Sequence, residues 1–309
     1  MCAGRLLDYS QLLDWAKDDH QAAVDVYGKT VDLIGSDWPR PDGSNPRQFI
    51  ERHFQPVLIG ETPALITGYY EPVIDGADTP DAEFGFPLYR APAALSPNAP
   101  WHSRAEIEEG DLLAGSEIVW LSSAIEAFLA QVQGSVRISL RDGRCLRLGH
   151  AGKNGHPYRS VGAELVRRGE VAPDKISSQA IRDWCAANPA LVPELLRHNP
   201  SFGFFRQIDL PESAGPIGTM GRSVTAFRSV AFDPDHSPLG ALVWLEKAGD
   251  QPRGNLMVAQ DTGSAIKGAQ RADVFCGTGA EAGVIAGNMR VSGRLVTFFP
   301  RAHIPGVLG

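Results

Sequence analysis

The sequence predicts a mainly β fold with helices, in which one domain is inserted into another. The 309 residues are long for one compact core and suit two domains. Both chain ends carry short apolar runs punctuated by glycine, which is typical of brief strands, whereas the middle of the chain changes to helical and hairpin patterns. We therefore expect a discontinuous domain from residues 1–92 and 204–309, and a smaller β-rich domain from residues 93–203.

The overall composition is that of an ordinary globular protein. Hydrophobic residues make up 43% and charged residues 21% of the chain, with a formal net charge of −7. Lysine and arginine are scattered instead of clustered, so the sequence predicts no nucleic-acid-binding face. A neutral or mixed-charge ligand fits this balance better.

Local patterns predict the first elements. Asp19 is placed to cap a helix with apolar residues at three- and four-residue intervals, and Gly35 is expected to end it. The stretch 64–70 also predicts a strand.

The middle of the chain contains a helix, a hairpin and two further helices. Ser123 and Glu126 form a capping-box pattern ahead of a short helix. Segments 135–140 and 145–149 predict a hairpin that turns at Asp142-Gly143 and has one wet, basic face. Capping and breaker residues then predict helices over 161–168 and 179–187.

Three aspartates lie in a glycine-rich stretch near the C-terminus: Asp233, Asp261 and Asp273. Asp followed by Thr-Gly or Pro-Asp is a common turn signal, so each could be purely structural. However, Asp261 and Asp273 follow or interrupt apolar runs, the pattern of a strand that delivers a side chain to a cleft. A carboxyl group in apolar surroundings has a raised pKa and can act as a general acid. Asp233 is better explained as a structural ligand for backbone amides.

The segment from Arg222 to Phe299 resembles the three-aspartate domain of the membrane-bound lytic murein transglycosylase A family. It contains DTGSAIKG, RADVFCGTGAEAG and GRLVTFFPR in order. Further segments resemble the family, in family order, over nearly the full length: GYYEP (68–72), FPLYRAP (86–92), RAEIEEG (104–110), QVQGS (131–135), AGKNGHPYRSVG (151–162) and NPSFGFFRQ (199–207).

The resemblance implies a fold and a reaction. The expected fold is a double-psi β-barrel made from both chain ends, with a β-rich domain between them and a long groove for a linear glycan. Lytic transglycosylases cut the β-1,4 bond between N-acetylmuramic acid and N-acetylglucosamine without water, because the muramyl C6 hydroxyl attacks C1 and forms a 1,6-anhydro end. One carboxyl group can serve as acid and then as base.

The resemblance assigns that role to Asp273, and the neighbouring Val274 and Phe275 can supply the desolvation. Asp261 is the natural second carboxylate, either keeping Asp273 protonated or stabilising positive charge at C1. Two other functions stay open: a hydrolysing β-glycanase with two acting carboxylates, and a glycan-binding module without catalysis.

Candidate substrate-binding residues fall in several segments. Tandem tyrosines in GYYEP could pack across strands or form a platform for a sugar ring. The loop 151–162 could be a simple surface turn, or could offer amide and hydroxyl groups to the glycan, with His156 structural instead of catalytic. The predicted substrate-binding set is Tyr69, Tyr70, Glu71, Gln133, Ser135, Asn154, His156, Tyr158, Ser160, Lys267 and Gly277.

The four cysteines show no metal-ligand spacing, so no metal or cofactor is expected. Cys145 and Cys185 could form a disulfide, but free buried thiols are favoured. Cys276 stands where the family resemblance implies a bulky aromatic residue, a departure that could alter a sugar subsite.

The resemblance also implies a place of action. We expect a monomer that acts on peptidoglycan strands in the periplasm, with an export signal removed from this chain. Cys2 is either incidental or the remnant of a lipid-attachment site at the outer membrane.

Overall fold

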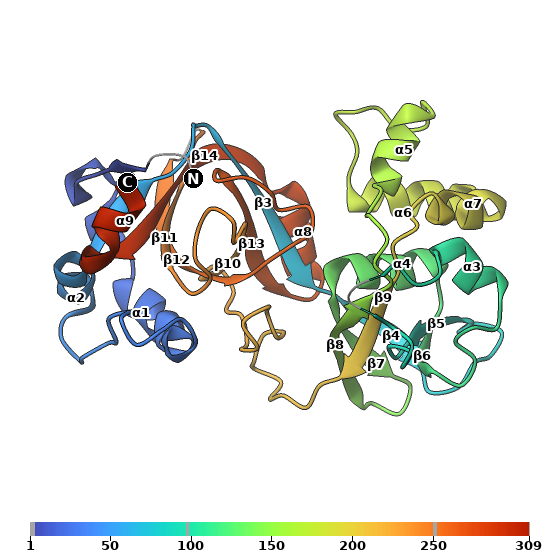
Figure 1. Ribbon diagram of the computed structural model, residues 1–309. Coiled ribbons are helices and arrows are strands. Elements are labelled where there is room, and N and C mark those ends of the chain that lie inside the picture. The colour runs from blue at the N-terminus through green and yellow to red at the C-terminus, as the bar shows by residue number, and fades with distance from the viewer. Residues whose placement is uncertain (1–3, 97–98, 250–251, 309) are drawn as a thin grey trace. The chain divides into compact units, whose positions relative to one another are not determined.

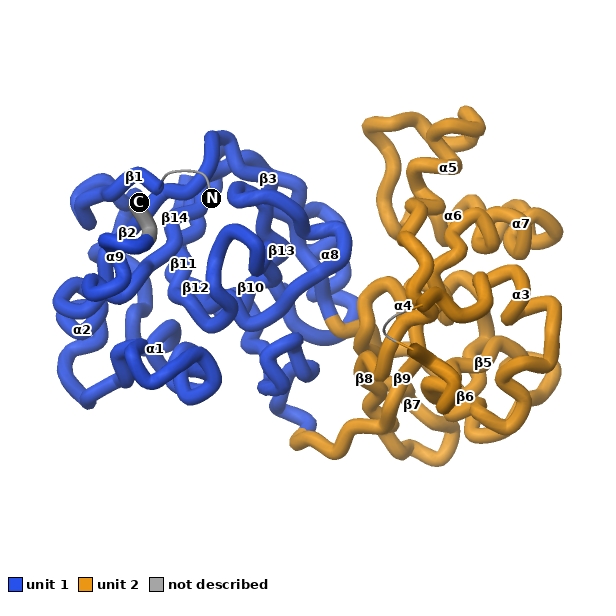
Figure 2. Tube along the Cα trace, in the orientation of Figure 1, with its two compact units in different colours: residues 1–70, 212–309 blue, residues 71–211 orange. Residues whose placement is uncertain are grey.

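The computed structural model describes residues 4–96, 99–249 and 252–308, and these form two compact units. Unit 1 combines residues 1–70 with 212–309, and unit 2 consists of residues 71–211 (Figure 2). The boundaries expected after residues 92 and 203 both fall inside unit 2. Residues 86–89 pair with the strand 117–121, and residues 203–207 pair with the strand 145–153, so both flanking segments belong to this unit. Within the described ranges, no helix combines the length and apolar character needed to cross a membrane.

Unit 1 is built around a closed β-barrel of six strands (Figure 1). The ring runs β14-β11-β12-β10-β13-β3 and closes through the pairing of β14 with β3. β10 and β12 are parallel, whereas β10 is antiparallel to β13. The strands of the unit are β1 (Arg5–Leu6), β2 (Phe54–Leu58), β3 (Ala64–Glu71), β10 (Ser229–Phe232), β11 (Leu242–Lys247), β12 (Arg253–Asp261), β13 (Arg271–Thr278) and β14 (Arg290–Pro300).

Alternation along the strands separates two cores. On β12, Met257 and Ala259 belong to the cluster inside the barrel, whereas Leu256 and Val258 pack outward against the helices near the N-terminus. The helices of the unit are α1 (His20–Gly28), α2 (Pro46–His53), α8 (Ala280–Asn288) and α9 (Ile304–Leu308), with 3₁₀ turns at Tyr9–Gln11, Trp15–Lys17, Val31–Leu33 and Arg301–His303.

The predicted first helix begins as expected and ends early. Asp19 caps α1 by accepting a hydrogen bond of 3.1 Å from the backbone N–H of Ala22. The helix stops at Gly28 instead of Gly35, and a 3₁₀ turn over Val31–Leu33 continues the apolar spacing that suggested a longer helix.

Unit 2 contains a six-stranded sheet and several helices. The sheet order is β5-β6-β4-β7-β8-β9, and β4 pairs with β7 in parallel. Its strands are β4 (Val73–Ala77), β5 (Phe86–Tyr89), β6 (Glu117–Leu121), β7 (Ser135–Leu140), β8 (Cys145–Lys153) and β9 (Gly203–Gln207), and its helices are α3 (Arg104–Glu109), α4 (Ala124–Gln133), α5 (Val161–Arg167), α6 (Ser178–Ala187), α7 (Val192–Arg197) and a 3₁₀ turn at Pro189–Leu191. The unit is therefore mixed α and β instead of mainly β.

The predicted helices and hairpin of unit 2 are present, but three details differ. Ser123 makes no side-chain capping bond, and the Glu126 carboxylate that would complete the capping box pairs with Arg182 at 2.5 Å instead. The hairpin face expected to be wet and basic carries Arg137, whose side chain is 11% exposed because it pairs with a buried carboxylate. Cys145 is exposed, contrary to the expected buried thiol, because it lies at the start of β8 beside the turn.

Candidate active site on the outer face of the barrel

Asp273 lies in the middle of β13, between Ala272 and Val274, both of which point into the barrel. Its carboxyl therefore points outward, where it is partly buried and accepts a hydrogen bond from the hydroxyl of Thr67 on β3. Burial raises the pKa of Asp273 and the charge of Asp261 adds to the rise, while the Thr67 hydrogen bond and Arg271 oppose it. The site thus holds a carboxyl group biased towards its protonated form.

Asp261 ends β12 and is close to Asp273 through the sheet register. Ala231 of β10 lies opposite Asp273 on one side and opposite Asp261 on the other. Two strand spacings separate the two aspartates, about 10 Å between backbones. Ala231, which lies between the two aspartates, is 4% exposed and contributes only a methyl group there.

Asp261 is anchored by four hydrogen bonds. Its Oδ1 accepts bonds from the backbone N–H and hydroxyl of Thr219, at 2.9 and 2.8 Å, and from the backbone N–H of Thr262 at 2.9 Å. Its Oδ2 accepts a bond of 2.8 Å from the Tyr69 hydroxyl. Asp261 is the acceptor in all four bonds, and both of its oxygens are engaged.

Tyr69 is engaged on both sides. Its ring packs on that of Phe275 with centroids 5.3 Å apart, and its hydroxyl donates to Asp261. Burial and then the negative charge of Asp261 raise the pKa of Tyr69 well above its ordinary value, so the phenol remains a donor. Tyr70 instead contacts α8, where a Cβ at Gly283 would come within 2.9 Å of its ring.

The third aspartate of the motif has a structural environment. Asp233 is 2% exposed and accepts bonds from the backbone N–H of Gly268 at 2.8 Å and from Lys267 Nζ at 3.1 Å. Burial pushes the pKa of Asp233 upward, but these hydrogen bonds outweigh it and the net pKa is lowered. Lys267 therefore holds this loop through Asp233, while most of its side chain remains exposed.

Several predicted substrate residues serve as scaffold in the structure. Glu71 is 1% exposed and pairs with Arg137 and Arg147, which leaves no exposed carboxylate for a sugar. Asn154, 1% exposed, donates to two backbone carbonyls and accepts from the backbone N–H of Phe202. His156 bonds the carbonyl of Trp101 at 2.8 Å.

The remaining predicted residues differ in accessibility. Ser160 caps α5 by accepting from Ala163, and Ser135 is buried at the start of β7. Tyr158 is 40% exposed, Gln133 is half-buried, and Gly277 adopts a left-handed φ of 117° at the end of β13.

Cys276 lies away from the outer face. By alternation along β13 it points into the barrel, where it is 3% exposed and burial raises its pKa to about 11. The Gly68 backbone lies so close that a Cβ on it would come within 2.9 Å of the Cys276 sulfur. Little space is therefore left beside Gly68 for a side chain larger than cysteine at position 276. Cys276 therefore does not reach the outer face, and the expectation that it alters a sugar subsite is wrong if the effect requires direct contact with the sugar.

Sequence patterns missed the partners that hold the two carboxyl groups. Thr67 could have been found, because it alternates with Tyr69 on the predicted strand and must share its face. Thr219 carried no local signal, since it lies in a loop 42 residues before Asp261.

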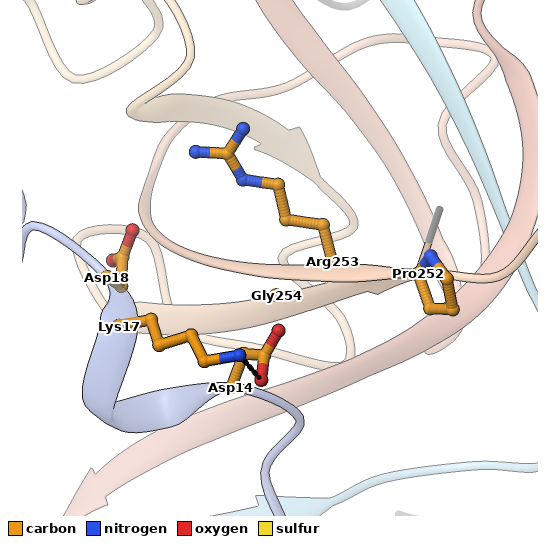
Figure 3. A pocket seen from close by; sticks show the side chains of 6 residues that line it. All are labelled: Asp14, Lys17, Asp18, Pro252, Arg253 and Gly254. Carbon is orange, nitrogen blue, oxygen red and sulfur yellow. Dashed lines mark ion pairs between the residues drawn. The ribbon is translucent and has the colours of Figure 1, made fainter. Parts of the chain in front are cut away.

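A separate surface pocket of about 370 Å³ contains none of these aspartates. Figure 3 shows its lining, with Lys17 and Asp14 paired at 2.9 Å. Asp18, which also lines it, is held by Arg228 at 2.8 Å and by the backbone N–H of Leu256. In the ranges that the structure describes, no group of His, Cys, Asp or Glu side chains is arranged to hold a metal ion.

Comparison with known proteins identifies relatives across the chain. Residues 65–206 match the MltA specific insert domain and residues 228–298 match the 3D domain. The membrane-bound lytic murein transglycosylase A of Escherichia coli (strain K12) is 41% identical over 240 residues, covering 74% of this chain and 64% of the relative. The chain thus matches just under two thirds of the length of that curated relative.

Solved structures match over more of their length. A membrane-bound lytic murein transglycosylase from Agrobacterium tumefaciens superposes with a TM-score of 0.88 at 29% identity, covering 99% of each chain. E. coli MltA with bound chitohexaose is 33% identical, with a TM-score of 0.72, covering 91% of this chain and 83% of that one. The chain belongs to the membrane-bound lytic murein transglycosylase A (MltA) family.

Proposed function

We propose that this protein is a lytic transglycosylase that cleaves the β-1,4 bond between N-acetylmuramic acid and N-acetylglucosamine in peptidoglycan and leaves 1,6-anhydromuramyl ends. The observation that carries the proposal is the raised pKa of the outward-facing Asp273 carboxyl beside the anchored carboxylate of Asp261. Family membership and the chitohexaose bound by the E. coli relative support a glycan substrate.

Asp273 supplies the acid and then the base. Thr67 donates to Oδ1, so Oδ2 is the oxygen that carries the proton to the glycosidic oxygen. As the C1–O bond breaks, positive charge develops at C1, and the resulting Asp273 carboxylate then removes the proton from the C6 hydroxyl as it attacks C1. No water is consumed.

Asp261 acts through its charge. It raises the pKa of Asp273, which favours the acid form, and a fixed carboxylate nearby stabilises a developing oxocarbenium ion. Its four hydrogen bonds oppose a role as nucleophile or water-activating base, because they engage both carboxylate oxygens and hold them in place. This favours the one-carboxyl mechanism over a two-carboxylate hydrolase.

Several finer features belong to the same proposal. We propose double-psi topology for the barrel, on the basis of its six strands and the parallel β10–β12 pair. Exposure leaves Tyr158 and Lys267 as the best-supported glycan contacts of the predicted set, with Tyr69 bordering the acid. The peptidoglycan substrate implies action in the periplasm, and attachment to the outer membrane through Cys2 remains part of the hypothesis.

Digestion of purified peptidoglycan followed by mass spectrometry tests the reaction. Anhydromuramyl ends are one water lighter than hydrolysed ends, so the transglycosylase predicts the lighter product. A reducing-end product would support the two-carboxylate hydrolase. Glycan binding without any product would support a binding module.

A further inference from the structure

One aromatic residue of unit 1 combines an exposed side chain with an unusual backbone. Phe227 has a φ of 56°, in the left-handed region, and is 40% exposed. Among the described residues, Asp14 is the other non-glycine residue with a positive φ, and aspartate adopts this conformation far more readily than phenylalanine. A bulky residue at positive φ has a strained backbone, and such strain is concentrated at functional sites.

A short turn holds Phe227 in this conformation. The carbonyl of Thr225 accepts hydrogen bonds from the backbone N–H groups of Arg228 at 3.1 Å and Ser229 at 2.8 Å, so Phe227 is the third residue of the turn. The Ser229 hydroxyl accepts from the backbone N–H of Thr225 at 2.8 Å and donates to Gln260 at 2.6 Å, which anchors the turn. Glycine is the usual residue at a turn position with positive φ, so the backbone alone does not call for a phenyl ring here.

The turn lies beside the strand that carries the acid. The backbone N–H of Phe227 donates to the carbonyl of Phe275 at 2.8 Å, and a Cβ built on Gly277 would lie 3.7 Å from the Cβ of Ala226. Phe275 follows Asp273 by two residues on β13, which is about 7 Å along the strand. Phe227 is therefore within the span of a short oligosaccharide from the proposed acid.

The loop that leads into this turn also holds the second carboxylate. Thr219 donates to Asp261 from its backbone N–H and from its hydroxyl. The loop folds back on itself there, because the backbone N–H of Gly218 donates to the carbonyl of Arg222 at 3.0 Å. Loops fixed on a rigid scaffold are common places for substrate-binding residues. This loop fixes Asp261 at one end and presents Phe227 at the other.

Exposure alone does not distinguish Phe227, since single exposed apolar side chains are normal on protein surfaces. What distinguishes it is the type of side chain. In the part of unit 1 that the structure describes, the other exposed large apolar side chains are aliphatic: Leu6, Leu13, Leu33, Val284 and Ile285. An aromatic ring offers a flat apolar face, which matches the apolar C–H face of a pyranose ring.

We propose that Phe227 is a platform on which one sugar ring of the glycan stacks, next to the acid on unit 1. The platform rests on the proposed glycan cleavage and adds a substrate-binding residue outside the set predicted from the sequence. Stacking on a sugar that does not react stabilises the bound substrate and the transition state alike, so the platform contributes to KM and not to kcat.

Substitutions at position 227 separate the ring from the backbone. Phe227→Gly removes the ring and relieves the strain, and Phe227→Asn is a second variant that keeps a side chain tolerated at positive φ. Phe227→Trp keeps an aromatic face. Asp14→Gly is the matched control, because it removes the side chain at the other positive-φ position, which lines the separate surface pocket.

Binding of chitohexaose, the oligosaccharide bound by the E. coli relative, gives a readout independent of activity. Every protein in this series carries Asp273→Asn so that the probe is not cleaved. By titration calorimetry we expect Phe227→Gly and Phe227→Asn to raise Kd about 5- to 20-fold, with a Tm not below that of the Asp273→Asn reference. Phe227→Trp and Asp14→Gly should bind within about threefold of the reference. In proteins that retain Asp273, KM for peptidoglycan should rise by a similar factor with kcat within about twofold.

A Kd within about twofold of the reference in either Phe227→Gly or Phe227→Asn overturns the platform, as does a reference protein that does not bind chitohexaose. Weaker binding with a lower Tm in both variants assigns the ring to packing and also overturns it, and equal weakening in Asp14→Gly does the same for the strain argument. If chitohexaose binding depends on Phe227 while the parent yields no anhydromuramyl product, the proposed function fails and the platform stands.

Discussion

Replacing Asp273 by asparagine separates catalysis from folding. The amide has nearly the shape of the carboxyl, and its oxygen can still accept the Thr67 hydrogen bond, but it has no acidic proton to give. General acid or base catalysis contributes about 10²- to 10⁴-fold to a rate. Because one carboxyl performs both steps in the proposed reaction, we expect Asp273→Asn to lower kcat by at least about 10³-fold.

The same substitution should not destabilise the fold at neutral pH. The folded-state pKa of Asp273 lies above its ordinary value of 3.8, so the folded state binds this proton more tightly than the unfolded state does. The resulting stabilisation is complete below the unfolded pKa and is lost as pH rises through the folded pKa, by about 1.4 kcal/mol for each unit between the two values. Asparagine does not ionise, so the variant should gain stability relative to the parent between acidic and neutral pH.

Anhydromuropeptide release measured by mass spectrometry gives the rate, and thermal unfolding at acidic and neutral pH gives the stability comparison. Asp261→Asn is the matched control, because it changes the neighbouring carboxylate in the same way. Turnover within about tenfold of the parent would refute the assignment of Asp273, since even the low end of acid catalysis exceeds that loss. Loss of both activity and folding at neutral pH would contradict the stability argument.

Three further substitutions test the surroundings of the acid. Thr67→Val removes a hydrogen bond that lowers the pKa of Asp273, so the basic limb of the pH–rate profile should move to higher pH; an unmoved limb would place the titration elsewhere. Asp261→Asn removes a charge that raises this pKa, so we expect the limb to move to lower pH and kcat to fall less than in Asp273→Asn; a shift in the opposite direction contradicts the charge argument. Asp233→Ala leaves the Gly268 amide without its partner and Lys267 with only the longer contact to Asp235, and should cost about 1–3 kcal/mol in urea unfolding at neutral pH, with unchanged kcat in the folded fraction. Because the pKa of Asp233 is lowered, this stability difference should shrink as pH falls through its folded-state value, and a difference independent of pH would show that packing dominates.

Elements whose signals are local could be predicted well from the sequence. The cap at Asp19, the hairpin around Asp142-Gly143 and the strand over 64–70 each depend on residues a few positions apart. The end of α1 was misplaced because a 3₁₀ turn after it continued the same apolar spacing. The capping box at Ser123 failed because its glutamate had a stronger partner, Arg182, 56 positions away.

For the candidate site, the sequence predicted candidate aspartates but not the side chains that hold them. Apolar neighbours marked Asp261 and Asp273, and the turn pattern marked Asp233 as structural. By contrast, GYYEP and the loop 151–162 contained polar residues that suit a sugar and also suit a scaffold, and composition cannot distinguish the two. The structure places Glu71 and Asn154 in the scaffold, because both are buried. Glu71 pairs with arginines, and Asn154 donates hydrogen bonds to backbone carbonyls.

The order of residues was sufficient to recognise the family, to predict that one segment is inserted into another and to select three aspartates as candidates, because short motifs and residue periodicity are properties of the sequence. Three relations are visible only in the folded chain: Ala231 lies between Asp261 and Asp273, Thr67 and Thr219 donate hydrogen bonds to them, and Arg147 binds both Glu71 and Pro211. These relations connect residues from 30 to more than 200 positions apart. They arise from strand register and burial, which exist only once distant segments have paired.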